Sequence, residues 1–204
     1  AMERTGFVMV DTSATKRKSE NTSNYYTVIL DNHPDREAFP KRSRSFIGST
    51  NFQRSKGYHG WGSDSGPMVM IPYDGVKIGL VNKRDMWDTK ITLFGQRMSI
   101  ESANHIFDYM DLKADIQNFE NFATLLKNGD DRAKEKFRRG IGQQRAEKYG
   151  KTFMDELWKA YSAESTKHTA HTTKTLPRPL PKTEVWVGGK VILIDHNMWK
   201  KMRT

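Results

Sequence analysis

The sequence contains no cysteine, which excludes disulfides, thiol catalysis and cysteine-based zinc or iron–sulfur sites. No apolar run approaches the roughly 18 residues that a membrane-spanning helix needs. The N-terminus also lacks the apolar core of a secretion signal. We therefore expect an unprocessed protein of the cytoplasm, or of the host cytoplasm if the protein is viral.

Recognisable enzyme motifs are also missing. The sequence has no phosphate-binding loop, no nucleophile elbow, no zinc-protease helix motif and no dinucleotide glycine fingerprint after a strand. Its six histidines are scattered, apart from His168 and His171 in a threonine-rich segment, which is more typical of a solvated turn than of a ligand set. We expect no metal site.

Acidic residues are in the minority. The 204 residues include 34 Lys and Arg against 24 Asp and Glu, a formal net charge of +10. Such a balance favours encounter with polyanions. Nucleic acid is the first candidate partner, and nucleotides, anionic lipid and acidic proteins remain open.

The sequence has enough apolar material for a core, since 36% of its residues are hydrophobic and 11% aromatic. Its patterns predict an α+β fold with a twisted, mainly antiparallel β core, an inserted helical subdomain and a C-terminal β-hairpin. We expect residues 1–98 to form the strand-rich N-terminal part of the core and residues 99–162 the helical subdomain. Residues 163–204 would form an extended linker and the hairpin that completes the core.

Strands are expected wherever apolar and β-branched residues run between turn signals. One such run, Tyr25 to Leu30, precedes a turn-forming stretch at 31–35. The turn at Asp74-Gly75 predicts a hairpin, and a second hairpin is expected around Gly188-Gly189. The glycine-rich segment 56–67 is typical of either a binding loop or a plain surface loop. The other expected strands are 6–10, 68–71, 76–81 and 91–94.

Helices are expected from Ser99 onwards, because apolar residues recur there with helical spacing. Ser99 and Asp130 are suitable N-caps. The aromatic residues on these helices are expected to pack in the core. The expected helices cover 100–110, 112–126, 130–140 and 146–161.

The helical region also carries the densest group of cations. These side chains could form a solvated face or a surface that follows phosphates, and the sequence leaves both possibilities open. Together with a cation from the stretch 41–44, the candidate nucleic-acid-binding residues are Lys41, Arg132, Lys136, Arg138, Arg139 and Arg145.

The stretch 40–51 surrounds Phe46 and Ile47 with cations and hydroxyl groups. It could be an exposed basic loop that runs into an edge strand. Arginine and hydroxyl donors are also suited to binding an anion.

Residues 46–51 (Phe-Ile-Gly-Ser-Thr-Asn) and 184–187 (Glu-Val-Trp-Val), after a strand that ends near residues 33–36, resemble the mono-ADP-ribosyltransferases in their order. In one branch of that family an arginine and a Ser-Thr-Ser segment hold NAD, and a glutamate that begins a late strand is catalytic. Asn51 replaces the second serine here. Lys182 stands where toxin-like members have a second acid.

The resemblance implies that NAD is the cofactor and that ADP-ribose is transferred to a macromolecular acceptor. Glu184 would be catalytic, by stabilising the ribosyl oxocarbenium ion as nicotinamide leaves. In the second branch of the family, a histidine with a tyrosine partner replaces the arginine. Taken over both branches, the implied cofactor-binding residues are His33, Arg36, Arg42, Arg44, Ser49, Thr50, Tyr58 and Tyr73.

Two further interpretations remain open. The chain could be a non-enzymatic nucleic-acid-binding protein of viral or phage type, whose cations contact phosphates and whose exposed aromatics stack on bases. It could also be an assembly component with basic arms that become ordered against a partner.

Overall fold

The structure is a computed structural model, and it describes residues 6–14, 16–17, 23–57, 66–110 and 119–203. The chain forms two compact units. Unit 1 consists of residues 1–17, 38–85 and 168–204, and unit 2 of residues 18–37 and 86–167. The division therefore differs from the expected boundaries at 98/99 and 162/163.

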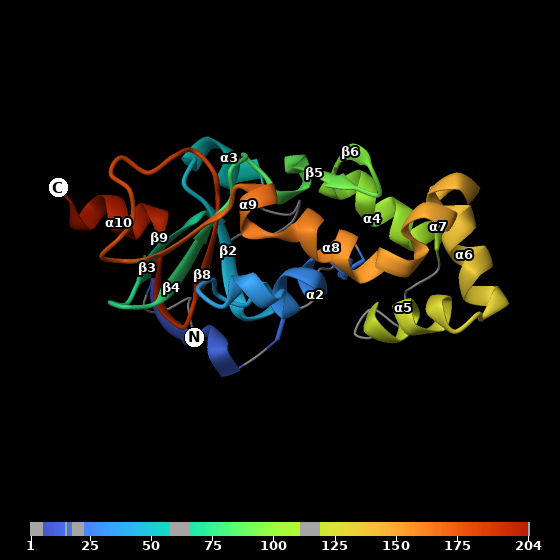
Figure 1. The fold of residues 1–204 in the computed structure, drawn as a ribbon. Helices are drawn as coiled ribbons and strands as arrows, with labels where there is room; N and C mark the ends of the chain where they lie inside the picture. Colours follow the sequence, from blue (N-terminus) through green and yellow to red (C-terminus); the bar gives the residue numbers. More distant parts are fainter. Residues whose placement is uncertain (1–5, 15, 18–22, 58–65, 111–118, 204) are drawn as a thin grey trace. The chain divides into compact units, whose positions relative to one another are not determined.

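Unit 1 is built on two antiparallel sheets (Figure 1). The first sheet has the strand order β1-β9-β3, and the second has the order β2-β8-β4-β7. Unit 1 also contains short α-helices and 3-10 turns. The strands are β1 (Phe7–Asp11), β2 (Ser45–Ser49), β3 (Met68–Pro72), β4 (Lys77–Leu80), β7 (Thr169–Thr172), β8 (Glu184–Gly188) and β9 (Lys190–Asp195), with α3 (Phe52–Gly57), α10 (His196–Met202), η1 (Thr12–Ala14) and η3 (Arg42–Arg44).

The core of unit 1 lies between the two sheets. Ile78 and Val185 belong to the second sheet, and they pack in one buried cluster with Val191 of the first sheet. Side chains alternate between the two faces of a strand. The residues at the alternate positions of β8, Glu184 and Trp186, therefore point to the opposite face of the second sheet.

Unit 2 is mainly helical. Ser99 and Asp130 are N-caps, as the sequence predicted, because their side chains accept backbone hydrogen bonds from Ser102 and Ala133. Its elements are α2 (Tyr25–Asn32), η2 (Pro34–Arg36), η4 (Met86–Asp88), β5 (Lys90–Leu93), β6 (Gln96–Ser99), α4 (Ile100–Tyr109), α5 (Phe119–Lys127), α6 (Asp131–Ile141), α7 (Gln143–Tyr149), η5 (Gly150–Thr152), α8 (Phe153–Tyr161) and α9 (Ala163–Thr166).

Aromatic rings form the core of the helical part of unit 2. Phe153 of α8 lies 5.3 Å from Phe137, 5.5 Å from Phe122 and 5.7 Å from Phe94, measured between ring centroids. The prediction that aromatics at helical spacing serve packing is confirmed at Phe153 and Phe137, which are both about 1% exposed.

The combination of antiparallel sheets and helices confirms the α+β class. The strand expected at Tyr25–Leu30 is wrong, since these residues belong to α2. Tyr25, Tyr26, Ile29 and Leu30 are buried at positions that share one helical face. A short apolar run fits a strand and a buried helix equally well, and here tertiary packing favours the helix.

Neither expected hairpin has a ladder between its two strands. β8 pairs with β2 and β4, whereas β9 pairs with β1 and β3. Only Gly189 separates β8 from β9, and the shortest common hairpin loop has two residues. With φ at +88°, Gly189 turns the chain from one sheet into the other. β3 and β4 are likewise divided between the two sheets.

Three other expectations are changed. The segment 162–181 contains α9 and β7, which pairs with β4, so this segment is not a simple linker. The helix expected over 146–161 is divided into α7 and α8 by η5. Of the helix expected over 112–126, the part up to residue 118 lies outside the described residues, and α5 represents the rest.

Candidate functional site

The ends of two neighbouring strands of unit 1 bring the best candidates together. Ser49, the last residue of β2, is the cross-strand partner of Glu184, the first residue of β8. Directly opposite residues of a ladder project to the same face. Beyond the ladder, Thr50 donates its backbone N–H to the Thr183 carbonyl at 3.0 Å and accepts the Thr183 N–H on its hydroxyl at 2.8 Å. The hydroxyl-bearing end of β2 is therefore held beside the start of β8.

The Glu184 carboxylate is buried and has two strong donors. Arg42 Nη1 donates to Oε1 at 2.7 Å, and the indole Nε1 of Trp186 donates to the same oxygen at 2.7 Å. The side chains of Arg42 and Glu184 are 7% and 8% exposed. We call Arg42, Glu184 and Trp186 the buried triad.

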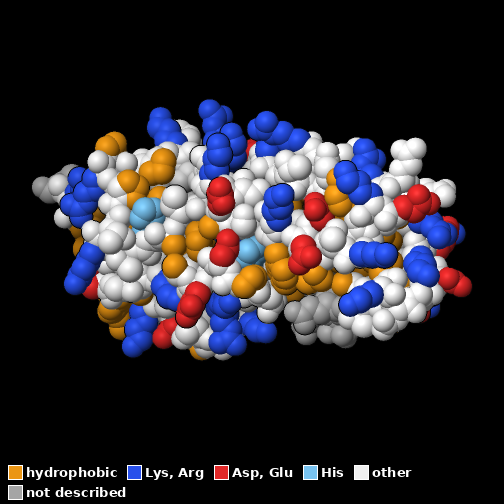
Figure 2. Space-filling model, viewed as in Figure 1, with side chains coloured by type: hydrophobic (Ala, Val, Ile, Leu, Met, Phe, Trp, Pro, Cys, Tyr) orange, Lys and Arg blue, Asp and Glu red, His pale blue; other side chains and the backbone are white. Residues whose placement is uncertain are grey.

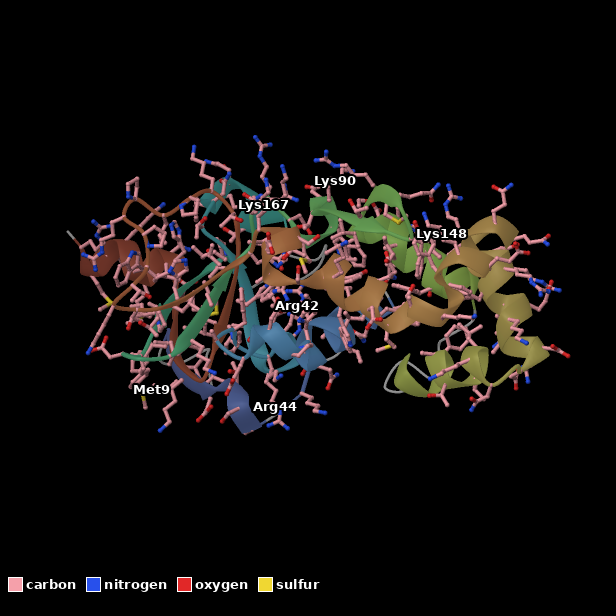
Figure 3. The ribbon with its side chains drawn as sticks, viewed as in Figure 1. Met9, Arg42, Arg44, Lys90, Lys148 and Lys167 are labelled. Carbon is pink, nitrogen blue, oxygen red and sulfur yellow. The ribbon has the colours of Figure 1, made fainter. Side chains whose placement is uncertain are left out.

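The triad combines two positions of β8 with a residue of η3. Glu184 and Trp186 stand two residues apart on β8, so both point to the same face. Arg42 lies in η3, the 3-10 turn immediately before β2, and its guanidinium carbon is 4.9 Å from the centroid of the Trp186 ring. Figure 3 shows Arg42 among the side chains near β2, and Arg44 apart from it at the lower edge of the drawn structure. The planar guanidinium can stack on an aromatic ring and bind a carboxylate at the same time.

Segment 38–42 also covers the outer face of the second sheet. A Cβ atom built on Gly79 would lie 3.0 Å from Trp186 Cε3 and 3.4 Å from Phe39 Cδ1. Gly79 is the cross-strand partner of Trp186 on β4. A glycine at this position therefore leaves room for the indole that holds Glu184.

An ion pair that is shielded from water is strongly coupled, because removal of one partner leaves the other as an uncompensated buried charge. An arginine and hydroxyl donors can bind a pyrophosphate, and a carboxylate can stabilise a developing positive charge. The triad and the hydroxyl-bearing end of β2 supply all three types of group.

The structure brings together Arg42, Ser49, Thr50 and Glu184 from the residues that the resemblance implied. Arg44 lies elsewhere, since it donates to the Ser13 carbonyl at 3.0 Å in an exposed position. Tyr73 lies near the opposite end of β8, where the Tyr73 N–H donates to the Lys190 carbonyl. Tyr58, the other implied residue of unit 1, lies outside the described residues.

His33 and Arg36 belong to unit 2, where both are buried. The His33 ring nitrogens contact the Trp158 carbonyl at 2.6 Å and the Asp35 carboxylate at 2.5 Å. Since a carbonyl oxygen can only accept, Nε2 carries a hydrogen.

Arg36 binds the C-terminal end of α8. Its guanidinium donates to the Tyr161 carbonyl at 2.9 Å, the Ser162 carbonyl at 3.1 Å and the Thr166 hydroxyl at 2.6 Å. Burial lowers the pKa of Arg36 to about 10, which still leaves it cationic at neutral pH. Burial also raises the pKa of the Tyr161 hydroxyl.

The candidate nucleic-acid-binding cations are spread over both units. Lys41 is exposed in unit 1, beside η3. On α6 of unit 2, Glu135 lies 3.7 Å from Arg138 and 2.9 Å from Arg139, and it offsets part of their charge. The other candidates of unit 2 are Arg132 and Lys136 on α6 and Arg145 on α7.

Sequence reasoning missed the contribution of Trp186, which orients the carboxylate through its indole N–H. The available signal was its spacing of two residues from Glu184 in a predicted strand, which places both side chains on one face. No spacing rule could connect either residue to Arg42, because 142 positions separate Arg42 from Glu184.

The part of the chain that the structure describes contains no group of three or more His, Asp and Glu residues that could hold a metal ion. Among the helices described there, none combines the length and apolar character needed to cross a bilayer.

No family model, curated protein or solved structure matches the chain.

Proposed function

We propose that the protein transfers ADP-ribose from NAD to a macromolecular acceptor, with Glu184 as the catalytic carboxylate. The observation that carries the proposal is the pairing of Ser49 with Glu184 at adjoining strand ends, with Arg42 on the carboxylate. An arginine, a serine and a glutamate are the three functional positions of the family branch that the sequence resembles.

The reaction begins with binding of the NAD pyrophosphate. Arg42 and the hydroxyls of Ser49 and Thr50 are the donors for its oxygens. In the structure, the Arg42 guanidinium is bonded to Glu184. The pyrophosphate takes over that guanidinium when NAD binds, and the carboxylate becomes available to the ribose.

Chemistry then takes place at the anomeric carbon of the nicotinamide ribose. The C–N bond breaks, and its electron pair leaves with nicotinamide and neutralises the pyridinium ring. Glu184 accepts a hydrogen bond from a ribose hydroxyl and stabilises the oxocarbenium ion electrostatically, without a covalent bond to it. A nucleophile of the acceptor bonds to the anomeric carbon and loses its proton to water.

Trp186 is a positioning residue in this scheme. Its N–H holds Oε1 of Glu184 at 2.7 Å. This contact keeps the carboxylate oriented after Arg42 has moved to the pyrophosphate. We place the reaction in the cytoplasm, which supplies NAD.

The test is Glu184→Gln, which keeps the side-chain shape and the acceptor for Trp186 while removing the charge. Released nicotinamide and transfer of labelled ADP-ribose to a cell extract are measured for both proteins. We expect the variant to lose at least about 100-fold in both assays, the scale of losing one electrostatic stabiliser. The matched control is Asp74→Asn, an exposed carboxylate in the turn between β3 and β4, which should keep full activity.

Binding is measured separately from chemistry. Saturating NAD should raise the thermal midpoint of the wild type, because a ligand that binds only the folded state adds RT ln(1 + [L]/Kd) to its stability. Arg42→Met should lose this shift. Wild-type protein that neither binds nor consumes NAD, or a fully active Glu184→Gln variant, would overturn the proposal.

A further inference from the structure

We propose that unit 1 binds single-stranded nucleic acid along a row of cations and aromatic rings that joins α3 to α10. The row, which we call the α3–α10 track, consists of Lys56, Phe52, His196, Lys200 and Arg203. This inference does not rest on the proposed transferase activity, because such binding needs neither NAD nor Glu184.

The centre of the track is an aromatic stack between the two helices. The rings of Phe52 and His196 are stacked, with centroids 4.3 Å apart and planes 27° apart. Lys56 Nζ lies 4.9 Å from the centroid of the Phe52 ring. Phe52 remains 38% exposed, so this stack lies at the surface of the protein.

α10 extends the track with cations. Asp195 caps this helix by accepting the N–H groups of Asn197 and Met198 at 2.9 and 3.0 Å. Lys200 and Arg203 follow His196 by four and seven positions, which places all three on one face. Both cations are exposed.

A second group of cations lies near Arg54, in the middle of α3. Arg54 of α3 pairs with Asp85 at 3.1 Å, next in sequence to the exposed Lys83 and Arg84. The Lys83 carbonyl accepts the Glu184 N–H at 3.4 Å, so this group also adjoins the start of β8, where exposed Lys182 precedes Thr183. We call Lys83, Arg84 and Lys182 the basic end.

Two carboxylates near these cations in the described part of the chain are already engaged. Asp85 is paired with Arg54, and Asp195 serves as the cap of α10. Figure 2 shows Lys and Arg side chains over α10 and above α3. The surface therefore attracts anions along its length.

The alternation of rings and cations identifies the partner as single-stranded nucleic acid. Cations follow the phosphates, and an exposed ring such as Phe52 accepts a base by stacking, which a base pair within a duplex cannot do without opening. A strand that reaches the basic end lies beside β8, the strand that Glu184 begins.

The test is fluorescence anisotropy with a labelled single strand of about 16 nucleotides, in the range that one such binding surface covers. Phe52→Ala should weaken binding by about 5- to 100-fold, the range for losing one stacked base. Phe52→Tyr should restore it. The double variant Lys200→Ala/Arg203→Ala should weaken binding and lower the salt slope by roughly 1.4, at about 0.7 per phosphate contact.

The matched control is Lys148→Ala/Lys151→Ala, which removes two exposed cations from α7 and η5 of unit 2 and should leave affinity and salt slope unchanged. Circular dichroism establishes that each variant is folded. The proposal is overturned if the wild type does not bind, if the Lys148/Lys151 variant loses affinity while the Lys200/Arg203 variant keeps it, or if a duplex of equal length binds as tightly. Glu184→Gln should bind like the wild type, so loss of catalysis and loss of this surface are distinguished.

Discussion

Arg42 and Glu184 form an ion pair of 2.7 Å in which each side chain is less than a tenth exposed. Their positions in the sequence are 142 residues apart, and the pair fixes η3 against the start of β8. Buried charges depend on each other, since either one alone would remain desolvated without compensation. The stability of unit 1 should therefore be sensitive to the removal of one charge and less sensitive to the removal of both.

Arg42→Met should lower the free energy of unfolding by about 3–5 kcal/mol, because it leaves the Glu184 carboxylate buried without its cation. The double variant Arg42→Met/Glu184→Gln should recover about 1–3 kcal/mol, since the neutral amide oxygen still accepts from Trp186. Urea denaturation followed by tryptophan fluorescence measures both values. If the effects of Arg42→Met and Glu184→Gln, each measured alone, add up to the effect of the double variant, the pair is not coupled.

Gly79→Ala should destabilise unit 1 by about 1–3 kcal/mol, the usual cost of overpacking a core. The new methyl group would lie 3.0 Å from Trp186 Cε3, and the indole is only 1% exposed. Thermal unfolding measures the loss, and a changed tryptophan emission should accompany it. Gly66→Ala is the control, because a Cβ atom added there would meet no atom within 4 Å. Equal stability of the two variants would contradict this account.

Arg36→Met should destabilise unit 2 by about 2–4 kcal/mol, because the Tyr161 and Ser162 carbonyls lose a charged donor. Arg36→Lys should recover only part of this loss, since an ammonium lacks the fixed fork of a guanidinium. Hydrogen exchange of the α8 amides measures the change locally. Full stability of the methionine variant would show that the three hydrogen bonds contribute nothing.

The pKa of Asp11 lies below its ordinary value of 3.8, chiefly because the Ser13 hydroxyl donates to the carboxylate, with the Ser13 backbone N–H as a second donor. A lowered pKa contributes stability above the unfolded-state pKa, and that contribution is lost as the pH falls through the folded-state value. Ser13→Ala should raise the pKa of Asp11. It should also reduce stability at neutral pH, with the difference disappearing in acid.

An NMR titration of the Asp11 carboxyl group measures this shift, with wild type and variant compared at the same salt concentration. Ser43→Ala is a serine control in unit 1. An unchanged pKa in Ser13→Ala would mean that the backbone N–H of residue 13 and the charge of Lys190 account for the lowering without the hydroxyl.

Several local features could be read from the sequence because they depend on near neighbours. Ser99 and Asp130 cap helices through the N–H three residues ahead, so the signal and its partner lie in one short segment. The strands β1, β3 and β5 were recognisable from their apolar runs. Glu184 at the start of a strand was also expected, and β8 begins there.

Pairing at a distance could not be read in this way. The run Tyr25–Leu30 suited a strand and became a helix, because its buried face depends on what packs against it. β8 and β9 are neighbours in the chain and pair in different sheets. The register that sets Ser49 opposite Glu184 depends on which faces of two sheets are buried together.

The charge of the chain, its helix caps and most of its strands follow from the order of the amino acids, because they depend on composition and on contacts within a few residues. The meeting of Arg42, Ser49 and Glu184 in one place, and the stacking of Phe52 on His196, exist only once the chain has folded. Such contacts join residues more than a hundred positions apart, and the burial of whole sheet and helix faces selects them.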